Sequence, residues 1–216
     1  MKKSLSVLAL FAIIVFGLNL VSCGGDADKS KQEVKEVSTD SVVDLGLPSG
    51  NLWASCNLGA DSPEKYGDYF AWGEVEKKDS FPKKGDNGYK HLGTLIGDDI
   101  AGTKYDAAMA VLGGDWKMPN QNDFNELIEN CKWEWTKYKD VDGYKVIGTN
   151  GNSIFFPATG FCDPILCNQA MSGYYWSSTD VKGFDAITLS FEKGKRNIKE
   201  ELRYRGQSIR PIIVKK

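Results

Sequence analysis

Hydrophobic and polar positions divide the chain into three stretches. Apolar residues run almost without interruption over 5–20, behind a positive start at Lys2 and Lys3. Charged and small polar residues dominate 26–43, with too little apolar area to offset the entropy lost on folding. From residue 44 onward, short apolar and aromatic segments alternate with glycine-rich turns. The pattern predicts a removable export signal, a solvated tether and one folded domain.

Within the domain, helical spacing is clearest over 119–131. Phe124 and Leu127 fall on one face of that segment, and Asn120 is suited to cap its first turn. A shorter helix is predicted over 105–112, ending before a glycine pair. The rest of the regular structure is expected to be β-strand.

Short runs of β-branched and aromatic residues between turn residues predict the strands. Asp142 and Gly143 are predicted to form one hairpin turn, and 150–152 the next, which gives an antiparallel meander. The predicted strands are 42–47, 52–57, 69–72, 133–139, 144–147, 154–157, 174–177, 186–191 and 208–214.

The end of the first apolar stretch has the features of a processing site. Leu20, Val21 and Ser22 precede Cys23, and this resembles the lipobox of bacterial lipoproteins. The resemblance implies that the signal peptide 1–22 is removed, that Cys23 takes lipid, palmitate included, and that 23–43 is a flexible tether. Several acyl chains on one cysteine anchor a protein stably. We therefore expect a membrane partner through Cys23 and a place in the cell envelope, at the outer membrane, with the periplasmic and external faces both open. The alternative is a retained transmembrane helix. Such a helix needs about 20 apolar residues, and the apolar run over 5–20 is slightly shorter.

Four cysteines remain beyond Cys23, an even number in an oxidising compartment. Of the three possible pairings we favour Cys162 with Cys167, a small loop, and Cys56 with Cys131, a long-range bridge. A metal site is the alternative, but the chain has no CxxC motif and only one histidine. No metal and no cofactor is predicted.

Charge argues against a nucleic-acid partner. The chain has 27 basic and 29 acidic residues and a net charge of −2. Its one basic run, 193–205, is interrupted by glutamates and is typical of a solvated face.

Five blocks of the sequence together resemble one known family, the Fibrobacter succinogenes major paralogous domain, which is common in lipoproteins of the Bacteroidetes. The blocks are DLGLPSGNLWASCNLGADSPEKYGDYFAWGE, AGTKYDAAMAVLGGDWKMPNQNDFNELIENCKWEW, GYKVIGTNGNSIFFPATGF, GYYWSST and GQSIRPI. They span 44–212 in family order, so the resemblance assigns 44–216 to this domain. It implies an α+β, C-type-lectin-like fold: a twisted antiparallel sheet with one or two helices and long loops. Its terminal strands meet, so 52–54 is expected near 209–212.

The motifs that carry chemistry in related proteins are missing. The chain lacks the EPN or QPD loop and the WND strand of calcium-dependent lectins, and it lacks the common hydrolase motifs. We therefore predict no catalytic residue and a noncatalytic, surface-exposed binding or adhesion module for a glycan or for an envelope or host protein. The expected ligand contacts lie on the long polar excursion 73–102 and on a later strand: Tyr89, His91, Asp98, Tyr174 and Tyr175.

Two other functions stay open. An envelope hydrolase would need paired carboxylates, for which Asp98, Asp99 and Asp106 are the candidates. A structural partner subunit of an envelope complex would dock through an exposed apolar patch.

Arg210 is expected to form an ion pair with an acid such as Glu74.

Overall fold

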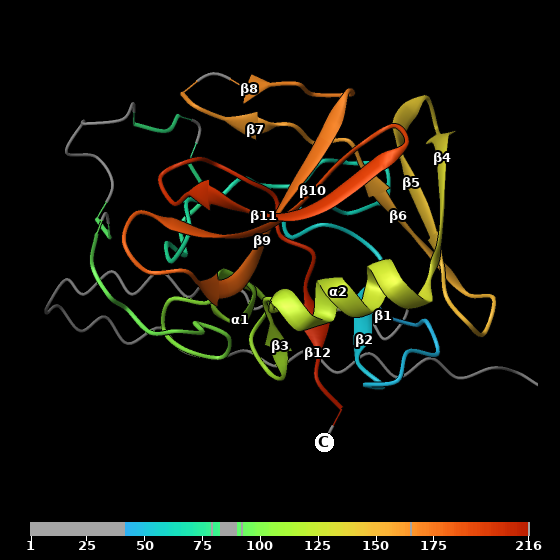
Figure 1. The fold of residues 1–216 in the computed structure, drawn as a ribbon, viewed down its shortest axis with the longest axis horizontal. Coiled ribbons are helices and arrows are strands. Elements are labelled where there is room, and N and C mark those ends of the chain that lie inside the picture. The colour runs from blue at the N-terminus through green and yellow to red at the C-terminus, as the bar shows by residue number, and fades with distance from the viewer. Residues whose placement is uncertain (1–41, 79, 83–89, 92, 165, 216) are drawn as a thin grey trace, which may run out of the picture. The chain divides into compact units, whose positions relative to one another are not determined.

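The computed structural model describes residues 42–78, 80–82, 90–91, 93–164 and 166–215. Antiparallel strands and two short helices make up this part of the chain, which is the α+β class predicted from the sequence (Figure 1). The export signal 1–22, Cys23, most of the tether and Tyr89 lie outside the described residues. Within them, no helix is both long enough and apolar enough to cross a bilayer.

The two ends of the described domain meet in a four-stranded sheet. It contains β1 (Val42–Asp44), β2 (Leu52–Ala54), β12 (Ile212–Ile213) and β3 (Trp116–Lys117), in the order β1-β2-β12-β3. Ile212 pairs with Trp53 in antiparallel register. The expectation that these two segments lie together is therefore confirmed.

A second sheet is the predicted meander, formed by β4 (Lys132–Tyr138), β5 (Val141–Ile147) and β6 (Ser153–Pro157). The turn between β5 and β6 is where the sequence predicts it. The turn between β4 and β5 is not, because Tyr138 pairs directly with Val141, and Lys139 and Asp140 adopt positive φ angles of 46° and 66°. The predicted turn at Asp142 and Gly143 is wrong, since both residues belong to β5.

A third sheet is formed by β9 (Ser172–Asp180), β10 (Asp185–Glu192) and β11 (Lys195–Leu202), and β7 (Phe161–Cys162) pairs with β8 (Leu166–Cys167). The basic run expected to be a solvated face is the strand β11 and the residues beside it. Four predicted strands are shorter in the structure. The strands predicted over 42–47 and 52–57 keep their first three residues, as β1 and β2. The segment 69–72 keeps a single bridge, from Phe70 to Gln207, and 208–214 keeps β12 and a bridge from Ser208 to Tyr175.

Both helices occur where the sequence predicts them, and each begins at a side-chain cap. α2 (Gln121–Asn130) has a capping box in which Asn120 and Asp123 satisfy each other's backbone N–H groups. α1 (Ala107–Leu112) begins at Asp106, whose fully buried carboxylate accepts N–H bonds from Gly102, Met109 and Met118. Burial raises the pKa of Asp106 even though these bonds favour its ionised form.

Aromatic side chains fill the core. Trp53, Trp72 and Trp176 are fully buried. Trp53 packs with Phe124 and Phe156, which joins α2 and β6 to the terminal sheet. Such large apolar side chains dominate core energetics.

Candidate functional site

A hollow in the described part of the surface lies on the outer face of the β4-β5-β6 sheet. Its volume is about 350 Å³. We call it the first hollow, and its lining residues are Ser55, Pro63, Thr136, Tyr138, Lys145, Ser153, Ile154 and Phe155.

Strand alternation explains why these side chains gather there. On β4 and β5, Trp133, Tyr144 and Val146 point into the core, so Thr136 and Lys145, which alternate with them, point outward. Register then places Lys145 opposite Phe155 of β6. The outer face of this sheet therefore carries both the polar and the aromatic groups of the hollow.

The absence of a side chain at Gly143 leaves room for the Phe155 ring. A side chain at position 143 would come within 2.7 Å of the Phe155 ring and within 2.3 Å of the Phe156 carbonyl oxygen. The ring of Tyr138, which is 42 % exposed, lies 5.6 Å from that of Phe155. The glycine thus leaves room for a two-ring aromatic floor at an otherwise ordinary sheet position.

The loop that walls the first hollow is tied to the sheet. Glu64, beside Pro63, accepts a bond from Lys139 Nζ at 3.0 Å, and this joins the loop to the β4–β5 turn. The Lys139 ammonium also lies 5.6 Å from the centre of the Tyr138 ring. Through Lys139, the ion pair and the cation–π contact link the loop that forms the wall to Tyr138 of the aromatic floor.

Arg210 lies beneath the same hollow. It is fully buried and donates to Asn57 Oδ1, to the carbonyls of Ala54 and Ser55, and at 2.7 Å to the carbonyl of Phe155. The predicted pairing of Arg210 with Glu74 is wrong, because these neutral oxygens take all of its donors. Desolvation lowers the pKa of Arg210, and its bonds join the loop after β2, the C-terminal segment and β6.

The second hollow, of about 200 Å³, contains the predicted contact His91. One ion pair lies within it, between Glu74 and Lys78, and Glu74 also accepts the backbone N–H of Lys90. The His91 ring meets the Tyr105 ring edge-on at 5.2 Å. Desolvation lowers the pKa of His91 against the opposing effect of Glu74. The residues that line the second hollow are Gly73, Glu74, Val75, Glu76, Lys78, Lys90, His91, Lys104 and Tyr105.

A buried ion pair stands behind the second hollow. Arg203 and Asp180 pair with both side chains fully buried, and the guanidinium lies 4.6 Å from the Trp72 ring centre. Arg203 also donates to the carbonyls of Thr94 and Asp185 at 2.9 Å. The 93–97 loop is thereby held against the β9–β10 hairpin.

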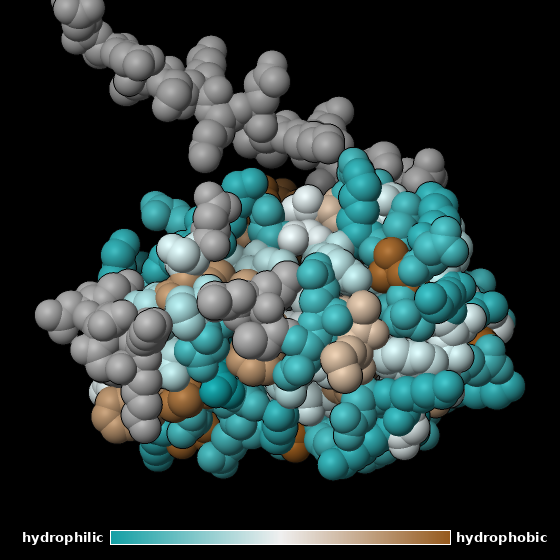
Figure 2. All heavy atoms as spheres, turned by 90° about the horizontal axis from the view of Figure 1, so that it is seen from above, coloured by the Kyte–Doolittle hydropathy of each residue, from teal (hydrophilic) through white to brown (hydrophobic). Residues whose placement is uncertain are grey.

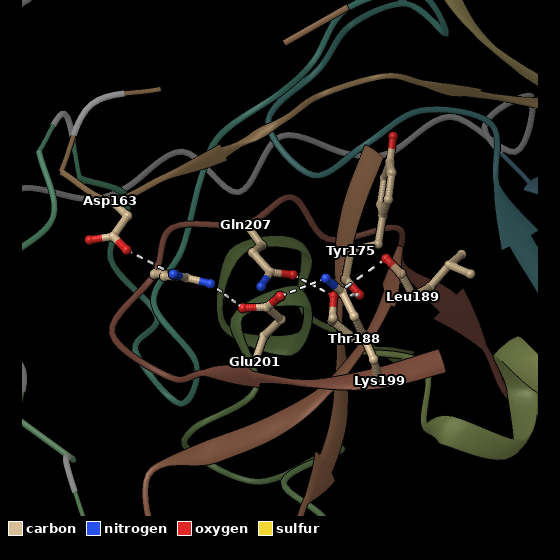
Figure 3. A network of polar contacts seen from close by, with 8 residues as sticks. Asp163, Tyr175, Thr188, Leu189, Lys199, Glu201 and Gln207 are labelled. Carbon is tan, nitrogen blue, oxygen red and sulfur yellow. Dashed lines mark hydrogen bonds and ion pairs between the residues drawn. The ribbon is translucent and has the colours of Figure 1, made fainter. Parts of the chain in front are cut away.

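The other predicted contacts do not join either hollow. Tyr175 is fully buried and its hydroxyl donates to the Pro157 carbonyl at 2.7 Å, so the prediction that it contacts a ligand is wrong. Tyr174 is half-buried under the Lys199 ammonium, which pairs with Glu201 in a chain of charges that Arg205 continues to Asp163 (Figure 3). Asp98 is exposed and lines neither hollow.

The candidate acids of a hydrolase are also dispersed. Asp98 and Asp99 are exposed, whereas Asp106 is buried as the cap of α1. Of the described residues, no carboxylate lines the first hollow. No group of three or more potential metal ligands occurs in the described part of the chain.

The long-range disulfide is a further correction. Cys56 and Cys131 are both free thiols, so the predicted bridge between them is absent from the structure. Cys131 ends α2 and packs against the core that β4 and β5 cover, while Cys56 follows β2 beside Ser55. The pairing of Cys162 with Cys167 stays a prediction, since the Cys167 side chain lies outside what the structure describes.

No family model, curated protein or solved structure matches this chain. Sequence reasoning missed the first hollow, although one signal was present: Thr136, Tyr138, Lys145 and Phe155 fall on the alternate positions that oppose the core residues of the predicted meander.

Proposed function

We propose that this chain is a lipid-anchored protein of the cell envelope whose domain binds glycans without catalysing a reaction. The domain would have the C-type-lectin-like fold that the sequence resemblance implies. The lipobox before Cys23 and the polar tether support the anchor. The pairing of β2 with β12 at the domain ends supports the fold.

The observation that carries the proposal is the composition of the first hollow. It combines an aromatic floor, Tyr138 and Phe155, with the hydroxyls of Ser55, Thr136 and Ser153. A sugar ring has an apolar face of C–H groups and a rim of hydroxyls, so it matches a surface of both kinds. Binding sites commonly place a few polar groups around apolar walls in this way.

The tied wall supports binding by a preformed site. Because Glu64 and Lys139 join the loop to the hairpin, and Arg210 bonds Phe155 from beneath, little ordering is needed when a ligand arrives. Preorganisation of this kind improves affinity by reducing the entropy lost on binding.

The hydrolase and the partner subunit are less well supported. Glycoside hydrolysis needs two facing carboxylates, and the acids of the described hollows are Glu74, already paired with Lys78, and Glu76. A docking subunit would need a broad apolar patch. On the face drawn in Figure 2, hydrophilic residues cover most of the described surface and hydrophobic ones form small separate groups.

A binding experiment tests the proposal. The full-length chain, purified in detergent, is applied to an array of neutral and acidic oligosaccharides and of matrix proteins. We expect saturable glycan binding that Tyr138→Ala weakens at least tenfold, a loss of about 1.4 kcal/mol. Tyr105→Ala, the matched tyrosine of the second hollow, should keep wild-type affinity.

Two results would contradict the proposal. Saturable binding to proteins alone would replace the glycan by a protein ligand. Glycan affinity that survives Tyr138→Ala but falls with Tyr105→Ala would move the site to the second hollow.

A further inference from the structure

The lysines of the β4–β5 hairpin differ in whether an acid neutralises them. Four lysines lie between residues 132 and 147. Three of them form ion pairs: Lys132 with Glu134 at 2.6 Å, Lys137 with Asp142 at 3.5 Å and Lys139 with Glu64 at 3.0 Å. Lys145 is the exception, because no acid among the described residues lies within ion-pair distance of it.

Lys145 is also the one member of this set that lines the first hollow. Its cross-strand neighbour on β4 is Glu134, whose carboxylate forms its ion pair with Lys132 and feels Lys145 only as a weaker Coulombic contribution that helps to lower the Glu134 pKa. Its neighbour on β6 is Phe155, part of the aromatic floor. Lys145 is therefore exposed beside the floor and forms no ion pair with its sheet neighbours.

The surroundings of Lys145 favour an anion from outside the protein. No other charged residue lines the first hollow, and Ile154, Phe155 and Pro63 give it apolar walls. Charges interact more strongly beside apolar walls than in bulk water. The hydroxyls of Ser153 and Thr136 add donors that suit an anionic oxygen.

The second hollow does not offer the same setting. It has more lysines, but Glu74 and Glu76 line it with them, and Glu74 takes both Lys78 and the Lys90 backbone N–H. An incoming anion would there meet carboxylates as well as ammonium groups. The first hollow is the better anion site although it has only one cation.

We infer that the glycan bound in the first hollow carries an anionic substituent, and that Lys145 binds that substituent while Tyr138 and Phe155 contact the sugar ring. This inference rests on the proposed function. A uronic acid carboxylate and a sulfate ester share the required chemistry, an oxyanion on a sugar, and the experiment distinguishes them.

The test compares three probes on the full-length chain by titration: an oligogalacturonate, a κ-carrageenan oligosaccharide, which carries sulfate esters and no carboxylate, and a neutral mannose oligosaccharide. We expect one or both acidic probes to bind more tightly than the neutral one, with an affinity that falls as salt rises. Lys145→Gln should weaken the acidic probe about fivefold or more and leave the neutral probe unchanged. Lys137→Gln, a neighbour outside the hollow, is the matched control and should change neither.

The outcomes separate this inference from the proposal beneath it. If Tyr138→Ala weakens binding but Lys145→Gln leaves the acidic probes unaffected, the inference is wrong and the glycan site remains. If Tyr138→Ala has no effect on any probe, the proposed function itself is wrong. Loss of the uronate alone in Lys145→Gln assigns a carboxylate, and loss of the sulfated probe alone assigns a sulfate.

Discussion

The two hollows of this domain differ in what their charges do. In the second hollow, Glu74 engages the Lys78 ammonium and the Lys90 backbone N–H, and Glu76 adds a second carboxylate beside the lysines. In the first, Lys145 lies beside aromatic rings without an acid partner among the described residues. The richer set of titratable groups, His91 included, is therefore not the site that we propose for binding.

The supports behind the two hollows differ as well. Arg203, behind the second, is neutralised by Asp180. Arg210, beneath the first, is buried among neutral oxygens and bonds Phe155 directly. Removing Arg210 should therefore damage the first hollow and the fold together.

The largest effect is expected from Arg210→Met. The change leaves the carbonyls of Ala54, Ser55 and Phe155 and the Asn57 side chain without their donors. We expect the free energy of unfolding to fall by about 3 kcal/mol or more. Urea denaturation followed by tryptophan fluorescence measures it.

The matched control is Arg205→Met, which removes an arginine from the half-exposed network with Glu201 and Asp163. Its cost should be about 1 kcal/mol or less. Equal losses for the two variants would mean that the buried bonds of Arg210 are no more important than a surface ion pair.

The free thiols of Cys56 and Cys131 offer a second comparison, between the edge of the first hollow and the end of α2. Cys56 Sγ lies 3.4 Å from the Ser55 hydroxyl that lines the first hollow. Cys131 is half-buried, and desolvation, with a smaller effect of Glu126, raises its pKa to about 11. A bound glycan should slow alkylation of Cys56 by iodoacetamide and leave Cys131 unchanged.

The rate at which iodoacetamide labels Cys131 should rise with pH. Because burial disfavours the thiolate, its labelling rate should rise about tenfold for each pH unit from about pH 8 to pH 10. Mass spectrometry of the native protein measures each site separately. A Cys131 rate that levels off near pH 9 would show an ordinary thiol, and failure of both residues to label would restore the predicted disulfide.

The smallest effect is expected from Glu64→Gln. It removes the ion pair with Lys139 that ties the Pro63 wall to the hairpin, and a solvated pair of this kind contributes little. We expect glycan affinity to fall a few-fold in titration, with no change for Asp61→Asn, which breaks the nearby surface pair with Lys65. An affinity loss as large as that of Tyr138→Ala would show that the wall, and not the aromatic floor, determines binding.

Much of the fold could be predicted from local sequence. The cap at Asn120 and the spacing of Phe124 and Leu127 predict α2 because both are contained within its own turns. The meeting of β2 with β12 came only from the family resemblance, since nothing local joins Trp53 to Ile212. The Asp142–Gly143 turn failed because a two-residue turn at Lys139 and Asp140 keeps both later residues in β5, where Gly143 makes room for Phe155.

The candidate site was harder to predict. Sequence reasoning favoured polar residues on a long loop together with Tyr174 and Tyr175 on a later strand, although the Tyr175 ring is fully buried. Exposure of one tyrosine and burial of another depend on strand register, as the contrast between Tyr138 and Tyr144 shows within one hairpin. Register follows from tertiary packing, which composition alone does not determine.

A crystal structure of the chain with a bound oligogalacturonate or κ-carrageenan oligosaccharide tests the central claim most directly. The account predicts a sugar ring against Tyr138 and Phe155, with its anionic group at hydrogen-bond distance from Lys145 Nζ. A sugar seated between His91 and Tyr105, with the first hollow occupied only by solvent, would contradict it.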